Sequence, residues 1–172
     1  VPVINPSHIV DNRLVPEDDV SVSSETAERL SSWTLNVGDI VVARRGELGR
    51  AAVIASESDG WICGTGSLRV TPDQNRATAE FLHAVLQSKY AREWLNQASV
   101  GSTMANLNEE ILGRLPLALP PVADQQAIAA FLDRETAKID ALVEEQKRLI
   151  ELVKEKRQAV ISQAVTKGLD PN

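Results

Sequence analysis

The residues with the clearest binding chemistry lie in one short segment, Arg44-Arg45-Gly46-Glu47-Leu48-Gly49-Arg50. Arginine donates paired hydrogen bonds to phosphate oxygens and to the edge of guanine, and glycine lets a backbone approach a ligand closely. Arg44, Arg45 and Arg50, with Gly46 and Gly49, are therefore candidates for contacts with a DNA duplex. A tight connection between two strands, with its arginines facing water, explains the same spacing equally well. A phosphate loop does not, because no Gly-Lys-Ser/Thr follows.

A second segment, residues 99–106, is rich in short side chains that form hydrogen bonds. Ser102, Thr103 and Asn106 have the chemistry to contact phosphates or bases. The composition alone favours a simpler interpretation, in which the segment precedes and caps a short helix that begins after Asn108.

Catalysis and metal binding find little support. Cys63 is the only cysteine and follows two apolar residues, so we expect a packed thiol rather than a nucleophile. His8 and His83 are far apart in the sequence, which does not favour a metal site. The Asn5-Pro6 pair matches only part of the Asn-Pro-Pro-aromatic motif of amino-methyltransferases and suits an ordinary turn. We expect no catalytic residue, no metal and no cofactor.

The net charge of −6 over 172 residues does not by itself indicate a nucleic-acid-binding protein. Residues 29–92 differ from the rest, because they hold eight basic and six acidic residues and are thus net +2. The chain has no apolar run near the roughly 20 residues that span a bilayer. Its start has no signal-peptide pattern, and with one cysteine a cytoplasmic protein is expected.

The elements that must position these residues change in kind along the chain. Up to residue 122, short apolar runs alternate with glycine and proline, which predicts strands and loops. Residues 40–43 and 51–55 are expected to form a hairpin around the arginine-rich segment. Apolar residues from 77 to about 97 recur every three or four positions, which predicts one amphipathic helix or two abutting ones.

From Asp124, the expected N-cap, to Thr166 the chain has no glycine or proline and is dominated by strong helix formers. A helix of this extent is about 64 Å long. It carries a heptad seam that its own small domain is too short to cover, so we expect it to pack on another helix. The apolar seam residues are Ile128, Leu132, Ile139, Leu142, Leu149, Val153 and Val160.

Taken together, these segments resemble the DNA-specificity subunits of type I restriction–modification enzymes. Residues 35–50, with Gly38-Asp39-Ile40 and Arg45-Gly46 through Gly49-Arg50, resemble a motif of their target-recognition domains. Further similar segments, in the family's order, are 106–107, 115–117, 120–128, 131–133, 138–140 and 159–168. Asp124 stands where the family usually has glutamate.

The resemblance implies a mixed α/β (α+β) recognition domain at 1–122, a single long coiled-coil-forming helix at 123–168 and a tail at 169–172. It also implies that the chain binds double-stranded DNA and reads one half of a bipartite target, with Arg44, Arg45, Arg50 and the loop around Ser102, Thr103 and Asn106 as candidate contacts.

The expected partners are the modification (methyltransferase) subunits, through them the restriction subunit, and a second spacer helix. Because such proteins carry two recognition domains, we expect this chain to be a fragment or a half-subunit. The alternative is a coiled-coil adaptor whose head domain binds protein or a small ligand, which the negative net charge would suit.

Overall fold

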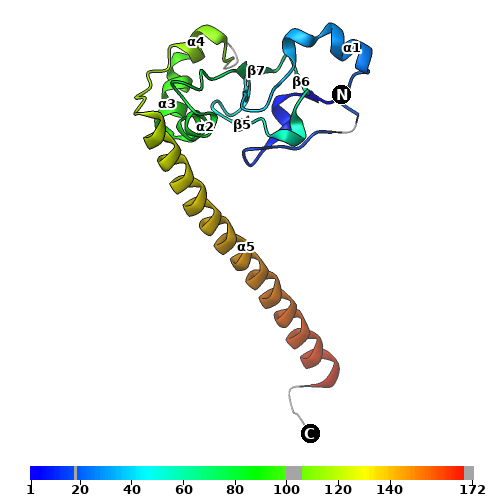
Figure 1. The fold of residues 1–172 in the computed structure, drawn as a ribbon. Coiled ribbons are helices and arrows are strands. Elements are labelled where there is room, and N and C mark those ends of the chain that lie inside the picture. Colours follow the sequence, from blue (N-terminus) through cyan, green and yellow to red (C-terminus); the bar gives the residue numbers. More distant parts are fainter. Residues whose placement is uncertain (18, 100–105, 169–172) are drawn as a thin grey trace. The chain divides into compact units, whose positions relative to one another are not determined.

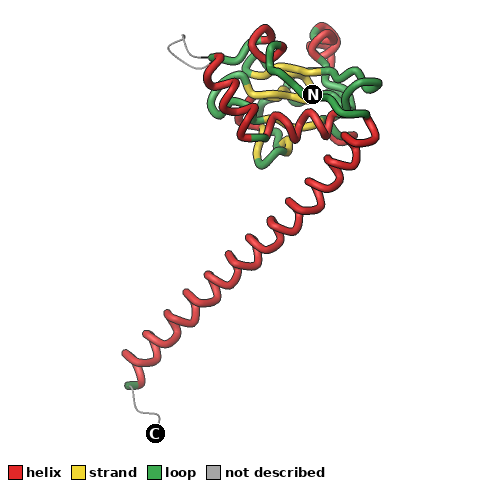
Figure 2. The backbone as a smooth tube through the Cα atoms, turned by 90° about the vertical axis from the view of Figure 1, so that its left-hand side faces the viewer, coloured by secondary structure: helices red, strands yellow, loops and turns green. Residues whose placement is uncertain are grey.

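The computed structural model describes residues 1–17, 19–99 and 106–168. Its contacts divide the chain into two units, Val1–Ala129 and Ala130–Asn172. The first unit holds all the strands and short helices among the described residues, and the second is helical as far as Lys167 (Figures 1 and 2). The mixed α/β domain and the long helix expected from the sequence are both confirmed.

The largest sheet of the first unit has the strand order β5-β4-β7, and both pairings are antiparallel. Its central strand is β4 (Ile40–Ala43), flanked by β5 (Ala51–Val53) and β7 (Ser67–Val70). Val41 lies opposite Ala52 on one side and Arg69 on the other. The hairpin expected around residues 44–50 is thus the pair β4–β5.

Strand β4 is apolar throughout because both of its faces are buried. Successive side chains of a strand point to opposite faces. Ile40 and Val42 enter a cluster with residues of the helices, whereas Val41 and Ala43 enter a second cluster with Ile4, Ile9, Leu35 and Cys63. A strand buried on both faces needs a continuous apolar run, and Ile-Val-Val-Ala supplies it.

Two smaller strand pairs complete the second cluster. Strand β1 (Val3–Ile4) runs parallel to β6 (Ile62–Cys63), and β2 (Ile9–Val10) pairs antiparallel with β3 (Arg13–Leu14). Asp11 and Asn12 connect β2 to β3 with φ angles of 47° and 63°. Aspartate and asparagine tolerate this left-handed conformation better than other side chains, so they suit a two-residue hairpin turn.

The short helices begin at polar caps. Helix α1 (Ser24–Arg29) follows Ser23, and α4 (Glu109–Gly113) follows Asn108, whose Oδ1 accepts from the Ile111 N–H at 2.8 Å. The expected helix near 77–97 is two helices, α2 (Ala79–Gln87) and α3 (Lys89–Ala98), because Ser88 is extended and caps α3. Three 3₁₀ turns are η1 (Pro6–His8), η2 (Ser31–Trp33) and η3 (Ser56–Ser58).

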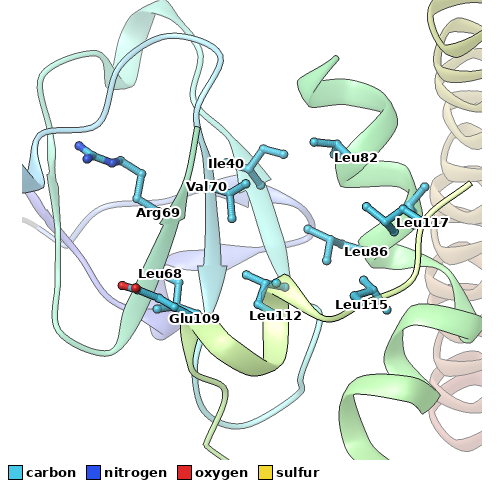
Figure 3. A pocket seen from close by; sticks show the side chains of 12 residues that line it. Ile40, Leu68, Arg69, Val70, Leu82, Leu86, Glu109, Leu112, Leu115 and Leu117 are labelled. Atoms are coloured by element: carbon cyan, nitrogen blue, oxygen red, sulfur yellow. The ribbon is translucent and has the colours of Figure 1, made fainter. Parts of the chain in front are cut away.

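An apolar hollow of about 350 Å³ lies where the sheet faces α2 and α4 (Figure 3). Ile40 and Val70 line it from the sheet, Leu82 and Leu86 from α2, and Leu112 from α4. The guanidinium of Arg69 points away from these aliphatic side chains, toward the other face of β7 (Figure 3). The two faces of this edge strand therefore differ in chemistry.

Helix α5 (Val122–Lys167) is 46 residues long, about 69 Å at the standard rise. It begins two residues before the expected cap. The N–H groups of Asp124 and Gln125 both donate to the carbonyl of Pro121, so Asp124 lies inside the first turn and is not the N-cap. Its negative charge is still stabilised there by the positive end of the helix dipole.

Two residues of α5 are buried within the first unit, Gln125 and Ala129. In the second unit the helix exposes its apolar residues, including Leu142 at 59% and Val153 at 58%. No helix in the part of the chain that the structure describes combines the length and apolar character needed to cross a membrane.

Candidate nucleic-acid interface

Arg44, just after β4, joins three separate segments. Its N–H donates to the Gly66 carbonyl at 3.0 Å, and its carbonyl accepts from the Leu107 N–H at 2.8 Å. Its side chain adds two bonds, from Nε to the Leu107 carbonyl at 3.1 Å and from Nη1 to the Thr65 carbonyl at 3.3 Å. The arginine-rich loop thus lies beside Leu107, which directly follows the predicted contact Asn106.

The tip of the loop is open. Arg45, Gly46 and Glu47 are exposed. Gly46 has φ +81°, and a Cβ added there would meet no atom within 4 Å. The positive φ angle therefore explains why glycine stands at position 46, since an added Cβ would meet no neighbouring atom. The open tip can approach a large ligand.

The other end of the loop is packed. Gly49 is buried, has φ +88°, and a Cβ there would lie 2.9 Å from the Leu86 carbonyl oxygen of α2. Gln87 Nε2 donates to the Gly49 carbonyl at 3.2 Å, and Arg92 pairs with Glu47 at 2.5 Å. The structure therefore accounts for Gly49 by close packing on α2, not by approach to a duplex.

Arg50 and Arg44 line different hollows. Arg50 lies with Asp11, Asn12 and Arg92 around a hollow of about 330 Å³, and its Nε is buried without a partner among the described residues. Arg44 lines a larger hollow of about 620 Å³. The three predicted arginines thus do not share one hollow.

Two predicted contacts, Ser102 and Thr103, lie outside the described residues. Asn106 is half-buried, and its Oδ1 has no hydrogen-bond partner within the described part of the chain. Asn108, the cap expected from the sequence, does begin helix α4.

Comparison with known families decides what kind of domain this is. Residues 1–152 match the model of the type I restriction modification DNA specificity domain. The chain belongs to this family. The match does not favour the adaptor alternative.

Two solved structures resemble this specificity domain. The crystal structure of the HsdS subunit from Thermoanaerobacter tengcongensis has a TM-score of 0.67 and 19% identity, and the match covers 99% of this chain and 44% of that one. A chain in a structure on complex assembly and conformational transition of the type I R-M system has a TM-score of 0.60 and 21% identity, over 81% and 36%. The specificity domain with its helix thus spans less than half of each of these chains.

The larger hollow of the specificity domain is lined by the polar residues Thr65, Ser67 and Arg69 and by Trp33, none of which was predicted from the sequence. One signal was present. In Ser67-Leu68-Arg69-Val70 the polar and apolar residues alternate, which predicts that Ser67 and Arg69 share the face opposite Leu68. That this face adjoins Trp33 depends on tertiary contacts.

Cys63 also lines this hollow, and it is only 5% exposed. Burial raises the pKa of its thiol to about 11, against the opposing effect of Arg69 and Arg44. The thiol is therefore protonated at neutral pH, which does not suit a nucleophile. Among the described residues no group of three or more His, Cys, Asp or Glu is arranged to hold a metal ion.

Proposed function

We propose that this chain is a DNA-specificity module that reads one half of a bipartite duplex target for a type I restriction–modification complex. The observation that carries the proposal is the family match over residues 1–152. The first unit would bind DNA, and methyl transfer and cleavage would belong to the modification and restriction subunits. The chain itself would be non-catalytic and act in the cytoplasm.

The DNA contacts would centre on the open tip of the β4–β5 connection. Arg45 and Gly46 are exposed there, and Arg44, next to the tip, bonds to Leu107, which directly follows Asn106. Ser102, Thr103 and Asn106 are the further proposed contacts. Arg50 would contribute from the neighbouring hollow, and Gly49 would support the loop from beneath without touching DNA.

Helix α5 would act as a spacer that pairs with a second helix and helps to dock the modification subunits. Its seam residues from Leu132 to Val160 are exposed, as is Ile128. Fully burying one leucine or valine side chain contributes about 1.5–3 kcal/mol, so a partner helix would be stabilised strongly. The second helix would come from another copy or from the other half of a longer protein.

The test is binding of the full chain to duplex DNA, measured by fluorescence anisotropy at several salt concentrations, with and without an adenine methyltransferase subunit of the same system. The proposal expects affinity that falls linearly on a log–log salt plot, because phosphate contacts release counterions. It also expects co-purification with that subunit. Binding to neither DNA nor the subunit would exclude it.

A further inference from the structure

The hollow of about 620 Å³ beside the edge strand β7 has polar walls that the predicted contacts do not explain. It is bounded by β1, β6, β7 and the turn η2. Its polar lining includes Asn5, Arg44, Thr65, Ser67 and Arg69. Of these, only Arg44 belongs to the set expected to touch DNA.

Both arginines of this hollow are held in place by backbone carbonyls. Arg69 donates from Nη1 to the Thr34 carbonyl at 2.5 Å, and Arg44 donates to the carbonyls of Leu107 and Thr65. A guanidinium has five N–H donors, so each side chain retains donors for a ligand. The charged side chains of the lining are these two arginines and Glu109, which leaves a positive balance that favours an anion.

Ser67 adds a second, independent observation. Its residue is 4% exposed, it lines the hollow, and its Oγ has no hydrogen-bond partner among the described residues. A buried hydroxyl without a partner costs free energy. A ligand oxygen that accepts from this hydroxyl would remove the cost.

The shape of the site decides which part of DNA suits it. Base edges lie inside the grooves and are reached by side chains that protrude, whereas the sugar–phosphate strand is itself the ridge of the duplex. The hollow therefore suits the protruding sugar–phosphate strand better than it suits base edges. Trp33, which lines the hollow and is 54% exposed, offers a flat apolar surface to a deoxyribose.

We infer that this hollow seats the sugar–phosphate backbone of one DNA strand, with Arg44 and Arg69 on phosphate oxygens and the hydroxyls of Ser67 and Thr65 donating to them. The inference rests on the proposed function and adds a backbone clamp to it. The clamp fixes how the domain lies on the duplex, and the loop tip at Arg45 reads the bases.

Arg69→Gln tests the clamp, because glutamine retains a donor but removes the charge. Anisotropy with a mixed-sequence duplex should show a salt slope smaller by about one and an affinity roughly fivefold lower near 0.15 M salt. Arg13→Gln is the matched control: it removes one exposed positive charge of the same domain outside the hollow, and it should leave both values nearly unchanged. The methylated sequence in cells should not change with either variant.

Thr65→Glu is the second variant, because Thr65 is exposed and accepts the Arg44 hydrogen bond with its backbone carbonyl, which the substitution retains. A carboxylate there should repel the phosphate and weaken binding, even if Arg69→Gln fails to fold. If both variants fold and bind with the wild-type affinity and salt slope, the clamp is excluded. A changed target sequence with an unchanged slope would overturn it in favour of a base contact. If the wild-type chain shows no salt-dependent binding, the proposed function itself fails.

Discussion

The side-chain carbonyl of Gln125 accepts a hydrogen bond from the backbone N–H of Thr78 at 3.0 Å. The same side chain donates from Nε2 to the carbonyls of Arg76 and Pro120, both at 2.8 Å, and Gln125 is fully buried. One amide thus binds the first turn of α5 to the loop that precedes α2. These bonds hold the first turn of α5 within the first unit.

Replacing Gln125 should therefore destabilise the first unit. Gln125→Ala leaves one backbone donor and two carbonyls without this partner, and should lower the free energy of unfolding by about 2–4 kcal/mol. Gln125→Glu should cost at least as much when ionised, because a carboxylate cannot donate to either carbonyl. The neighbouring Gln126 is exposed, so Gln126→Ala should have little effect. Urea unfolding followed by tryptophan fluorescence measures all three; equal effects at 125 and 126 would contradict the anchor.

The two glycines of the arginine-rich loop should respond differently to alanine. Both have positive φ, which costs an alanine about 1–2 kcal/mol. Gly46→Ala should cost only this amount, because the site is open. Gly49→Ala should cost clearly more, since its Cβ would press on the Leu86 backbone. Thermal melting of the two variants compares them directly, and a larger loss at Gly46 would contradict the packing described for this loop.

Replacing Arg44 and replacing Arg45 should have different effects. Arg45→Ala removes an exposed charge at the loop tip, so it should weaken DNA binding and reduce the salt slope by about one with no change in melting temperature. Arg44→Ala should lower both affinity and melting temperature, because it also removes two bonds that hold residues 65 and 107. Anisotropy and differential scanning fluorimetry on the same samples give both values. Wild-type affinity in the Arg45 variant would remove that residue from the interface.

Cys63 should react slowly while the domain is folded. Its pKa is raised from 9.0 to about 11 by burial, so at pH 9 about half of the unfolded thiol is ionised but little of the folded one. The raised pKa contributes stability that is complete below pH 9 and is lost as the pH rises toward 11. Iodoacetamide labelling at pH 9, with and without denaturant, should show much faster reaction in the unfolded chain. Equal rates would mean that the thiol is not buried.

The seam of α5 should determine self-association or pairing. Leu142→Asp and Leu149→Asp each put a charge in the predicted interface and should weaken it severely. Ala137→Asp lies on the opposite face of the heptad and should not. Analytical ultracentrifugation of the chain, alone and mixed with the complementary half of the system, shows the result. Association that survives both leucine variants would exclude this seam.

Much of the fold could be predicted because it follows local rules. The run Ile40–Ala43, the Asn108 cap and the uninterrupted helix formers after residue 122 each specify their structure within a few neighbours. The beginning of α5 was predicted wrongly, at Asp124, because Pro121 already provides the first helical carbonyl.

The site was harder to predict, because its geometry depends on contacts between distant parts of the chain. Arg44 bonds to Leu107, 63 positions away, and Arg69 bonds to Thr34, 35 positions away. The spacing of residues along the sequence does not predict such distant pairs. The three arginines that looked equivalent in the sequence therefore differ in the structure. Arg44 bonds to distant segments, Arg45 is exposed at the loop tip, and Arg50 is partly buried at the other end of the loop.

The most direct test of the central claim is a domain exchange in a complete system. Residues 1–122 are replaced by the corresponding domain of another family member with a known target, and the methylated motif is read by methylome sequencing. If the domain reads one half-site, that half of the motif should change to the donor's sequence, while the other half and the spacing stay the same. An unchanged motif, or one in which both halves change, would contradict the account.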